Sequence, residues 1–160
     1  MNQVDKISLR PATSLDRPFL MAVYTETREA ELAATGWSDE EKSAFCHSQF
    51  EAQDTHYREH FPNCDFLVIE KNTQPIGRLY IDRRPDEIRL VDIALLNAQR
   101  GRGIGGRLIL GILDEAAENG IMVRIHVERS NPARRLYDRL GFMVVEEGEI
   151  YDLLSWAKIL

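Results

Sequence analysis

Apolar and polar positions follow two different periods along this chain. In short runs they alternate, which is typical of strands with one buried face. In longer runs apolar residues return every three to four positions, which is typical of amphipathic helices. Short turn segments separate the second, third and fourth strand candidates, so we expect these three to pair antiparallel. The runs that predict strands are Ile7–Arg10, Phe66–Glu70, Pro75–Asp82, Ile88–Leu96, Met122–Glu128, Phe142–Glu146 and Ile150–Trp156.

Two helices are expected between the first and second strands. One opens near Ser14, where a side chain that can cap a helix is followed by an early proline, Pro18. The other begins at Ser38, with Glu41 in the spacing of a capping box, and ends before Pro62.

Two more helices are expected in the second half of the chain. The first follows a glycine-rich segment and ends at Asn119–Gly120. The second is short, with Asn131 as its cap, Pro132 at its first position and Gly141 at its end. The longer helix carries apolar residues at i+4 spacing, namely Ile104, Leu108, Ile112 and Ala116.

The composition indicates one compact domain over residues 1–160. Apolar residues make up 44% of the chain, and no long polar or Pro/Ser-rich linker divides it. No apolar run reaches the length of a membrane span, and charged residues interrupt the N-terminal segment. We therefore expect a cytoplasmic protein in which Cys46 and Cys64, which form no metal or redox motif, are thiols.

Charge is unevenly distributed along the chain. The net charge of −6 disfavours nucleic acid or an anionic membrane as a partner. Residues 26–59 carry nine acids against three bases, whereas the glycine-rich segment carries arginines and no acid. The acidic segment either attracts a cationic ligand or is an ordinary solvated helix face. Its acids are Glu26, Glu29, Glu31, Asp39, Glu40, Glu41, Glu51, Asp54 and Glu59.

The segment from Arg100 to Gly106 holds four glycines and two arginines between an apolar strand and an amphipathic helix. Glycine allows positive φ and close approach of a ligand, so successive amides can converge on one anion. The helix that follows adds its own unpaired amides and the positive end of its dipole. This combination predicts a pyrophosphate-binding loop rather than a flexible surface turn.

Two other patterns predict no separate site. The spacing Gly101-x-Gly103-x-x-Gly106 satisfies the dinucleotide fingerprint, but that fingerprint follows the first strand of its fold and needs several βα units after it. His56 and His60 stand at i and i+4, yet no third ligand joins them. We therefore expect both histidines to be solvated helix residues, and we expect no metal site.

These elements and motifs together resemble the GNAT superfamily of acyl-CoA-dependent N-acyltransferases over almost the whole chain. Arg100-x-x-Gly103-x-Gly105 matches that family's Arg/Gln-x-x-Gly-x-Gly/Ala loop, and Asn131–Phe142 matches its second signature helix. Asn97 stands where the family often has proline. The resemblance implies a mixed α/β GNAT fold with a mostly antiparallel central sheet, a parallel fourth and fifth strand that splay apart, and flanking helices.

The resemblance also implies acetyl-CoA as the cosubstrate and transfer of its acetyl group to a primary amine. Loop amides would hold the pyrophosphate, main-chain groups of the fourth strand would pair with the pantetheine arm, and Asn131 would contact the cofactor. A catalytically inactive CoA-binding sensor or interaction module is the alternative. The residues expected to bind the cofactor are Ile93, Ala94, Leu95, Arg100, Gly101, Arg102, Gly103, Ile104, Gly105, Gly106 and Asn131.

Three residues are candidates for acid and base roles. Tyr137 occupies the position of the family's general acid, although it could also simply pack beside the apolar stripe of its helix. His126 matches the position of a glutamate base in the protein N-terminal acetyltransferases, and its reference pKa of about 6.5 suits a base. Asp92 is the rival base, unless it pairs with Arg89 or Arg124 as scaffolding. A water chain is the remaining alternative.

The acceptor itself is not identified by the matched motifs, which concern the cofactor. The two N-terminal helices and the terminal hairpin would form the side from which it enters. If the acidic segment faces that side, a small cationic amine or a basic peptide amine is favoured. We also expect that a homodimer could form through the terminal strands.

Overall fold

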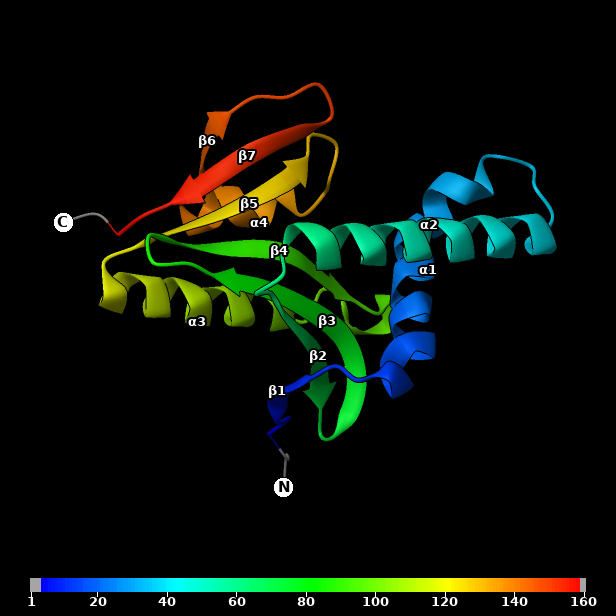
Figure 1. Cartoon of the computed structure of the whole chain (residues 1–160), viewed down its shortest axis with the longest axis horizontal. Coiled ribbons are helices and arrows are strands. Elements are labelled where there is room, and N and C mark those ends of the chain that lie inside the picture. Colours follow the sequence, from blue (N-terminus) through cyan, green and yellow to red (C-terminus); the bar gives the residue numbers. More distant parts are fainter. Residues whose placement is uncertain (1–3, 159–160) are drawn as a thin grey trace. The chain divides into compact units, whose positions relative to one another are not determined.

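The computed structural model describes residues 4–158 as a mixed α/β fold built on one seven-stranded sheet (Figure 1). The strand order is β1-β2-β3-β4-β5-β7-β6. The strands are β1 (Ile7–Pro11), β2 (Asp65–Lys71), β3 (Gln74–Arg83), β4 (Glu87–Leu95), β5 (Met122–Glu128), β6 (Met143–Glu146) and β7 (Tyr151–Trp156). The helices are η1 (Ser14–Asp16), α1 (Arg17–Ala33), α2 (Asp39–His60), η2 (Asn97–Gln99), α3 (Ile104–Asn119) and α4 (Arg134–Leu140).

The sheet confirms the predicted fold class. It is mostly antiparallel, and β4 and β5 form the parallel pair, with Glu87 opposite Met122 and Leu90 opposite Ile125. A parallel pair needs a crossover connection, which the glycine-rich segment and α3 supply. β7 lies between β5 and β6 and pairs antiparallel with both, so β5 is an inner strand.

Tertiary contacts divide the chain into two compact units. The first comprises the chain up to Tyr80 together with Asp92–Arg102, and the second comprises Ile81–Val91 together with the chain from Gly103 onward. β3 and β4 each contribute residues to both units. A single domain over residues 1–160 therefore stays a prediction.

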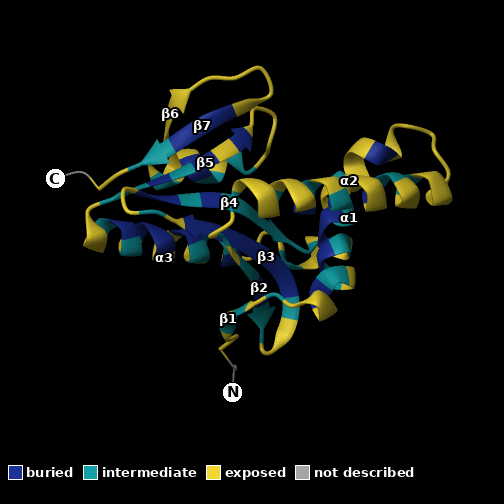
Figure 2. Ribbon diagram, viewed as in Figure 1, coloured by how far each residue is buried: buried dark blue, intermediate teal, exposed yellow. Residues whose placement is uncertain are grey.

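In the first unit, α1 and α2 pack together around a small aromatic and aliphatic cluster. The cluster consists of Leu20, Tyr24, Leu32, Cys46 and Phe50. Most of the long α2 is exposed (Figure 2), and only three of its residues are buried. The free thiol of Cys46 lies in this cluster, whereas Cys64 is half-buried.

One helix start was predicted correctly, and the other was predicted near its observed position but with the wrong cap. The Ser38 hydroxyl accepts a hydrogen bond from the Glu41 amide, and the Glu41 carboxylate accepts one from the Ser38 amide, which is the predicted capping box. The preceding helical stretch begins at Ser14 as the 3₁₀ turn η1, and Ser14 is not its cap. Thr13 instead forms a capping box with Asp16 around η1, and α1 begins after it at Arg17. Thr13, beside Ser14, is a second residue that can cap a helix, and the sequence does not show which of the two is the cap.

In the second unit, α3 packs on β5 and ends at Gly120, whose φ of 64° closes the helix in the left-handed conformation. The short helix α4 begins later than predicted. Asn131 is not its helix cap, because its side-chain oxygen accepts the Ala133 amide and the helix starts only at Arg134. This turn delays the helix past the proline. β6 is exposed along its whole length.

Among residues 4–158, no helix combines the length and the apolar character needed to cross a membrane.

Candidate active site

The glycine-rich segment forms a left-handed turn that leads into α3. Gly101 and Gly103 have φ angles of 74° and 79°, a region in which any side chain is strained, whereas Gly105 and Gly106 lie within the first turn of the helix. No heavy atom lies within 4 Å of where a Cβ would stand on Gly101 or Gly103. The space beside both residues is therefore open to a ligand.

The start of α3 presents amides without helical partners. Its first helical hydrogen bond joins the Arg107 amide to the Gly103 carbonyl at 3.1 Å, so the amides of Ile104, Gly105 and Gly106 precede the ladder. Gly103 is the N-cap and supplies no side-chain hydrogen bond. Such a helix end attracts an anion through its free amides and its dipole.

The end of β4 has a main-chain edge beyond its partner strand. Pairing with β5 ends at Leu90, while β4 continues to Leu95. This stretch contains Ile93, Ala94 and Leu95, the residues expected to pair with a pantetheine arm. The neighbouring β3 approaches it very closely at Gly77, where a Cβ would stand 2.3 Å from the Ala94 carbonyl oxygen. Sequence reasoning missed Gly77, although a glycine inside a strand often marks a place where another backbone approaches closely.

Helix α1 holds the connection between β4 and the glycine-rich segment. The Asn97 amide donates to the Glu26 carboxylate at 3.2 Å, and the Asn97 side chain donates to Glu29 at 3.1 Å. Arg100 folds back so that its Nε donates to the Leu95 carbonyl at 3.1 Å. A proline at position 97 would lack the amide that Glu26 accepts, so this departure from the family pattern has a structural use.

His126 lies on the exposed face of β5, opposite Leu153 of β7. Its Nδ1 is 3.5 Å from Nη1 of Arg89 on β4. Burial and the positive charge of Arg89 both lower the pKa of His126 below its usual value, so the imidazole is neutral at pH 7. A neutral imidazole can accept a proton, which a base requires.

Asp92 is paired, but with a residue that the sequence did not suggest. Its Oδ2 lies 2.5 Å from Nε of the buried Arg78 on β3. Arg89, one of the two expected partners, instead contacts Glu87 at 3.0 Å. The Nε of Arg124, the other expected partner, is buried without a hydrogen bond among the described residues.

Tyr137 is buried on α4, with 3% of its surface exposed. Its ring packs edge-on against Phe142, with 5.5 Å between the ring centroids. The residue therefore packs in the core of the second unit. This packing fixes the orientation of the ring.

Asn131 lines a hollow rich in arginine. The other lining residues are Arg129, Ser130, Pro132, Arg134 and Arg135. The buried Asp152 of β7 supports this segment, since it accepts from Arg134 Nη1 at 3.1 Å and from the Gly148 amide at 3.2 Å. Burial opposes its ionisation, yet that amide and the two neighbouring guanidinium groups keep the pKa of Asp152 below its usual value. The hollow carries positive charge that suits an anionic ligand.

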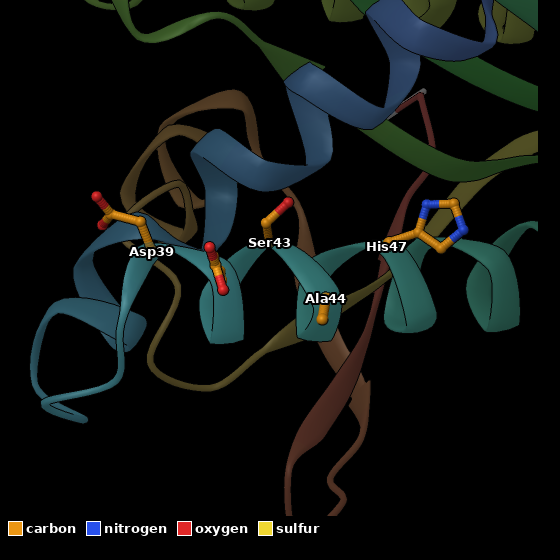
Figure 3. A pocket seen from close by; sticks show the side chains of 5 residues that line it. Asp39, Ser43, Ala44 and His47 are labelled. Carbon is orange, nitrogen blue, oxygen red and sulfur yellow. The ribbon is translucent and has the colours of Figure 1, made fainter.

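Two surface features on α2 do not form a site. His56 and His60 stack with their ring centroids 4.0 Å apart, and both are exposed. Within residues 4–158 no group of three or more His, Cys, Asp or Glu is placed to hold a metal ion. Figure 3 shows a hollow along the same helix, lined by Asp39, Glu40, Ser43, Ala44 and His47, all of them exposed. Because one helix alone forms it, the hollow encloses nothing.

The candidate residues fall into both units. The first unit brings together Asp92, the segment Ile93–Leu95 and Arg100, with Glu26, Gly77 and Arg78 as contributors that the sequence did not reveal. Residues of the second unit are Gly103, Ile104, Gly105, Gly106, His126, Asn131 and Tyr137.

Comparison with known proteins adds a family and several relatives. Residues 22–142 match the Acetyltransferase (GNAT) family. The chain is 28% identical over 122 residues to the mycothiol acetyltransferase of Corynebacterium glutamicum, covering 74% of this chain and 41% of that protein. It is 33% identical over 81 residues to the ribosomal protein bS18-alanine N-acetyltransferase of Haemophilus influenzae, covering 50% of this chain and 56% of that protein. The chain thus spans about half the length of these curated relatives.

A solved structure shows the same fold. The PaiA N-acetyltransferase of Thermoplasma acidophilum, in complex with coenzyme A, superposes with a TM-score of 0.72 at 18% sequence identity. The superposition covers 96% of this chain and 99% of that one.

Proposed function

Because the chain belongs to the Acetyltransferase (GNAT) family, we propose that it is an N-acetyltransferase that moves an acetyl group from acetyl-CoA to a primary amine. The observation that carries this proposal is the turn at Gly101 and Gly103, which opens into the unpaired amides of Ile104, Gly105 and Gly106. These groups suit the pyrophosphate of acetyl-CoA. Arg100 and Arg102 of the loop add positive charge that suits the same anion.

The unpaired stretch of β4 supports the proposed binding of the pantetheine arm. Main-chain groups of Ile93, Ala94 and Leu95 can pair with its amides as a further strand would. The amide near Leu95 would then stabilise the oxyanion that develops on the thioester carbonyl. Binding of this kind holds the thioester in a fixed position for attack.

The proposed reaction is direct attack in a ternary complex. The amine nitrogen forms a bond to the thioester carbonyl carbon, the carbon–sulfur bond breaks, and the nitrogen gives up one proton. His126, neutral at pH 7, would accept that proton directly or through water. Tyr137 would donate a proton to the departing thiolate, whose thiol has a pKa of about 8.5 by analogy with cysteine. A water chain remains the alternative route for the first proton.

The charges near the end of β4 support a cationic amine as the acceptor. Ion pairs with Arg17, Arg28 and Arg58 offset the charge of several acids of α1 and α2. Glu26 and Glu29 instead bind the neutral Asn97, and within residues 4–158 no arginine or lysine forms an ion pair with either of them. A charge placed there would attract a cationic amine. The curated relatives are named for different acceptors, mycothiol and a ribosomal protein alanine, so they point to no single one.

Turnover on a panel of amines tests the activity. The chain is incubated with acetyl-CoA and each amine, and release of the free thiol is followed at low and high salt. We expect cationic amines to give higher kcat/KM than neutral or acidic ones, with a preference that shrinks as salt screens the charges. Tight CoA binding without turnover on any amine would favour the sensor alternative. Neutral amines winning at both salt levels would refute the cationic preference.

The cofactor loop is tested separately by binding. We expect Gly103→Val to weaken CoA binding at least tenfold, about 1.4 kcal/mol, because a branched side chain fills the open space at the turn. Gly36→Val is the matched control, since Gly36 has a similar φ of 73° and the same open surroundings but lies outside the loop. Calorimetry on both folded variants decides the point. Equal CoA affinity in the two variants would exclude a role of the loop in CoA binding.

A further inference from the structure

An arginine is buried in the middle of β3. Arg78 is 3% exposed and is followed along the strand by the buried Leu79 and Tyr80. Its Nη2 donates to the Gln53 side chain of α2 at 2.8 Å, and its guanidinium carbon lies 5.1 Å from the centroid of the Tyr80 ring. Its Nε faces Asp92 of β4 at 2.5 Å. All of these residues belong to the first unit.

Stability does not explain this arrangement. Removing two charges from water costs several kcal/mol per ion, and replacing a buried ion pair by apolar residues is often neutral or stabilising. Burial is the largest influence on Arg78 and works against its charge, yet Asp92, Tyr80 and Tyr57 together keep the pKa of Arg78 above its usual value. Burial of Tyr80 raises the pKa of its phenol, and the negative charge of Asp92 raises it further, so Tyr80 stays neutral. The protein thus maintains a fixed charge pair among apolar neighbours.

The pair leaves hydrogen-bonding capacity unused. Arg78 Nε and Asp92 Oδ2 are both buried, and neither makes a hydrogen bond of regular geometry within the described residues. The Asp92 side chain nevertheless keeps 23% of its surface exposed, whereas that of Arg78 keeps 3%. Arg78 takes up only part of the acceptor capacity of the Asp92 carboxylate, because an ionised carboxylate offers about four acceptor positions on its two oxygens. The exposed part of the Asp92 side chain can therefore accept a further donor.

The position of Asp92 relates it to the proposed reaction. Side chains two residues apart share one face of a strand, so Asp92 lies on the face of Ala94, about 7 Å away along β4. Leu95, whose amide would stabilise the oxyanion, follows directly. A donor bound by Asp92 would therefore belong to the acceptor and lie several bonds from the nitrogen that reacts.

We propose that Asp92 binds a second cationic group of the acceptor, and that Arg78 and Gln53 hold its carboxylate in position. The substrate class is an amine with another ammonium group a few carbons from the reacting one. This inference rests on the proposed function and deepens it. It also separates Asp92 from the base: Asp92 would set affinity for one class of amine, whereas a base would act on every amine.

The test compares putrescine with butylamine, which has the same carbon chain and lacks the second amine. In Asp92→Asn we expect KM for putrescine to rise about tenfold or more, with kcat little changed and the pH profile retained. The kcat/KM for butylamine should fall much less than that for putrescine, because butylamine has no second ammonium group for Asp92 to bind. Gln53→Ala should reproduce part of the effect on putrescine. Glu40→Gln is the control, since it removes one negative charge from α2 without touching the pair.

A second variant guards against misfolding. Arg78→Met combined with Asp92→Leu replaces the whole pair with apolar groups, so no charge is left buried alone. We expect this variant to retain the thermal stability of the wild type and to lose the preference for putrescine. An unfolded double variant, or a folded one that keeps the preference, would overturn the proposal.

Binding distinguishes failure of this inference from failure of the proposed function. Calorimetry measures putrescine and butylamine on the CoA-loaded wild type and on Asp92→Asn, without turnover. Tighter binding of putrescine that is lost in the variant supports the anchor even if no thiol is released, in which case the proposed activity alone fails. Equal binding of the two amines to the wild type overturns the anchor. A kcat that falls equally for both amines in Asp92→Asn, with loss of the pH dependence, would make Asp92 the base instead.

Discussion

A single methyl group on Gly77 is expected to disturb the strand that would hold acetyl-CoA. The Cβ of Gly77→Ala would stand 2.3 Å from the Ala94 carbonyl oxygen and 2.9 Å from Leu95 Cδ2. Real Cβ contacts essentially never fall below 3.0 Å. The Ala94 carbonyl must therefore move by at least 0.7 Å, the difference between those two distances. The φ of Gly77 is not positive, so only the lack of space opposes the new side chain.

The expected cost follows from that displacement. Extra atoms in a well-packed interior destabilise a protein by about 1 to 3 kcal/mol, which lowers Tm by roughly 2 to 12 °C for a chain of this size. Because the displaced carbonyl belongs to the proposed pantetheine strand, CoA binding should weaken about tenfold. A misplacement near 1 Å also lowers turnover by about 100-fold when the thioester loses its alignment.

Calorimetric unfolding and CoA titration of Gly77→Ala measure both effects. Gly111→Ala is the matched control, since Gly111 lies in α3 with nothing within 4 Å of the new Cβ. It should raise stability by about 0.5 to 1 kcal/mol through helix propensity and leave CoA binding unchanged. Wild-type Tm and CoA affinity in Gly77→Ala would refute the close approach of β3 to Ala94. A loss of stability with unchanged CoA affinity would refute the role of this strand in binding.

Four further predictions concern single side chains. Tyr137→Phe keeps the edge-on packing of the ring, and it should lower kcat about 100-fold at unchanged CoA affinity if the hydroxyl is the acid. A kcat equal to that of the wild type would mean that Tyr137 serves only in packing. With saturating acetyl-CoA, kcat/KM of the wild type should rise with pH through a midpoint below about 6.5, and His126→Ala should flatten this rise. An unchanged pH profile in the variant would remove His126 from the mechanism. Glu26→Ala should weaken CoA binding several-fold, about 1 kcal/mol, by freeing Asn97, whereas Glu26→Gln should bind nearly as wild type because its amide oxygen still accepts. The pKa of Asp16 is lowered to about 2, chiefly by Arg10, so the stability that Asp16 contributes is present above its ordinary pKa and is lost as the pH falls toward 2. Asp16→Asn should therefore lower the free energy of unfolding by about 1 kcal/mol at neutral pH and make stability less sensitive to acid. Acid sensitivity equal to that of the wild type would contradict this prediction.

Local signals predicted most of the elements. Met122–Glu128 matches β5 at both ends, and the capping box at Ser38 fixed the start of α2, because each depends on residues that are neighbours in the chain. The caps predicted for α1 and α4 were wrong for the same reason. Thr13 and Asn131 make competing turns a few residues away, and the sequence does not say which turn prevails.

The site was less predictable because its decisive contacts lie far apart in the chain. Asp92 was expected beside Arg89 or Arg124, yet β3 supplies Arg78, and only the register of β3 and β4 determines that choice. Gly77 is important because the Ala94 carbonyl on the next strand lies close to it, and Glu26 is important because it accepts the Asn97 amide beyond β4. Pattern analysis shows which side chains share a face of one strand. It does not show which residue of another element stands opposite.

The hydrogen bonds between α1 and Asn97 have a consequence for protein engineering. A designer who wants a new acceptor preference would naturally exchange α1 for the corresponding helix of a relative. Here that exchange would also remove Glu26 and Glu29, the two carboxylates that hold the approach to the cofactor loop. If the proposed function holds, we expect donor affinity and acceptor choice to change together when α1 is exchanged. A graft of α1 should carry residue 97 with it, as asparagine where the incoming helix has acids at both positions and as proline where it has none.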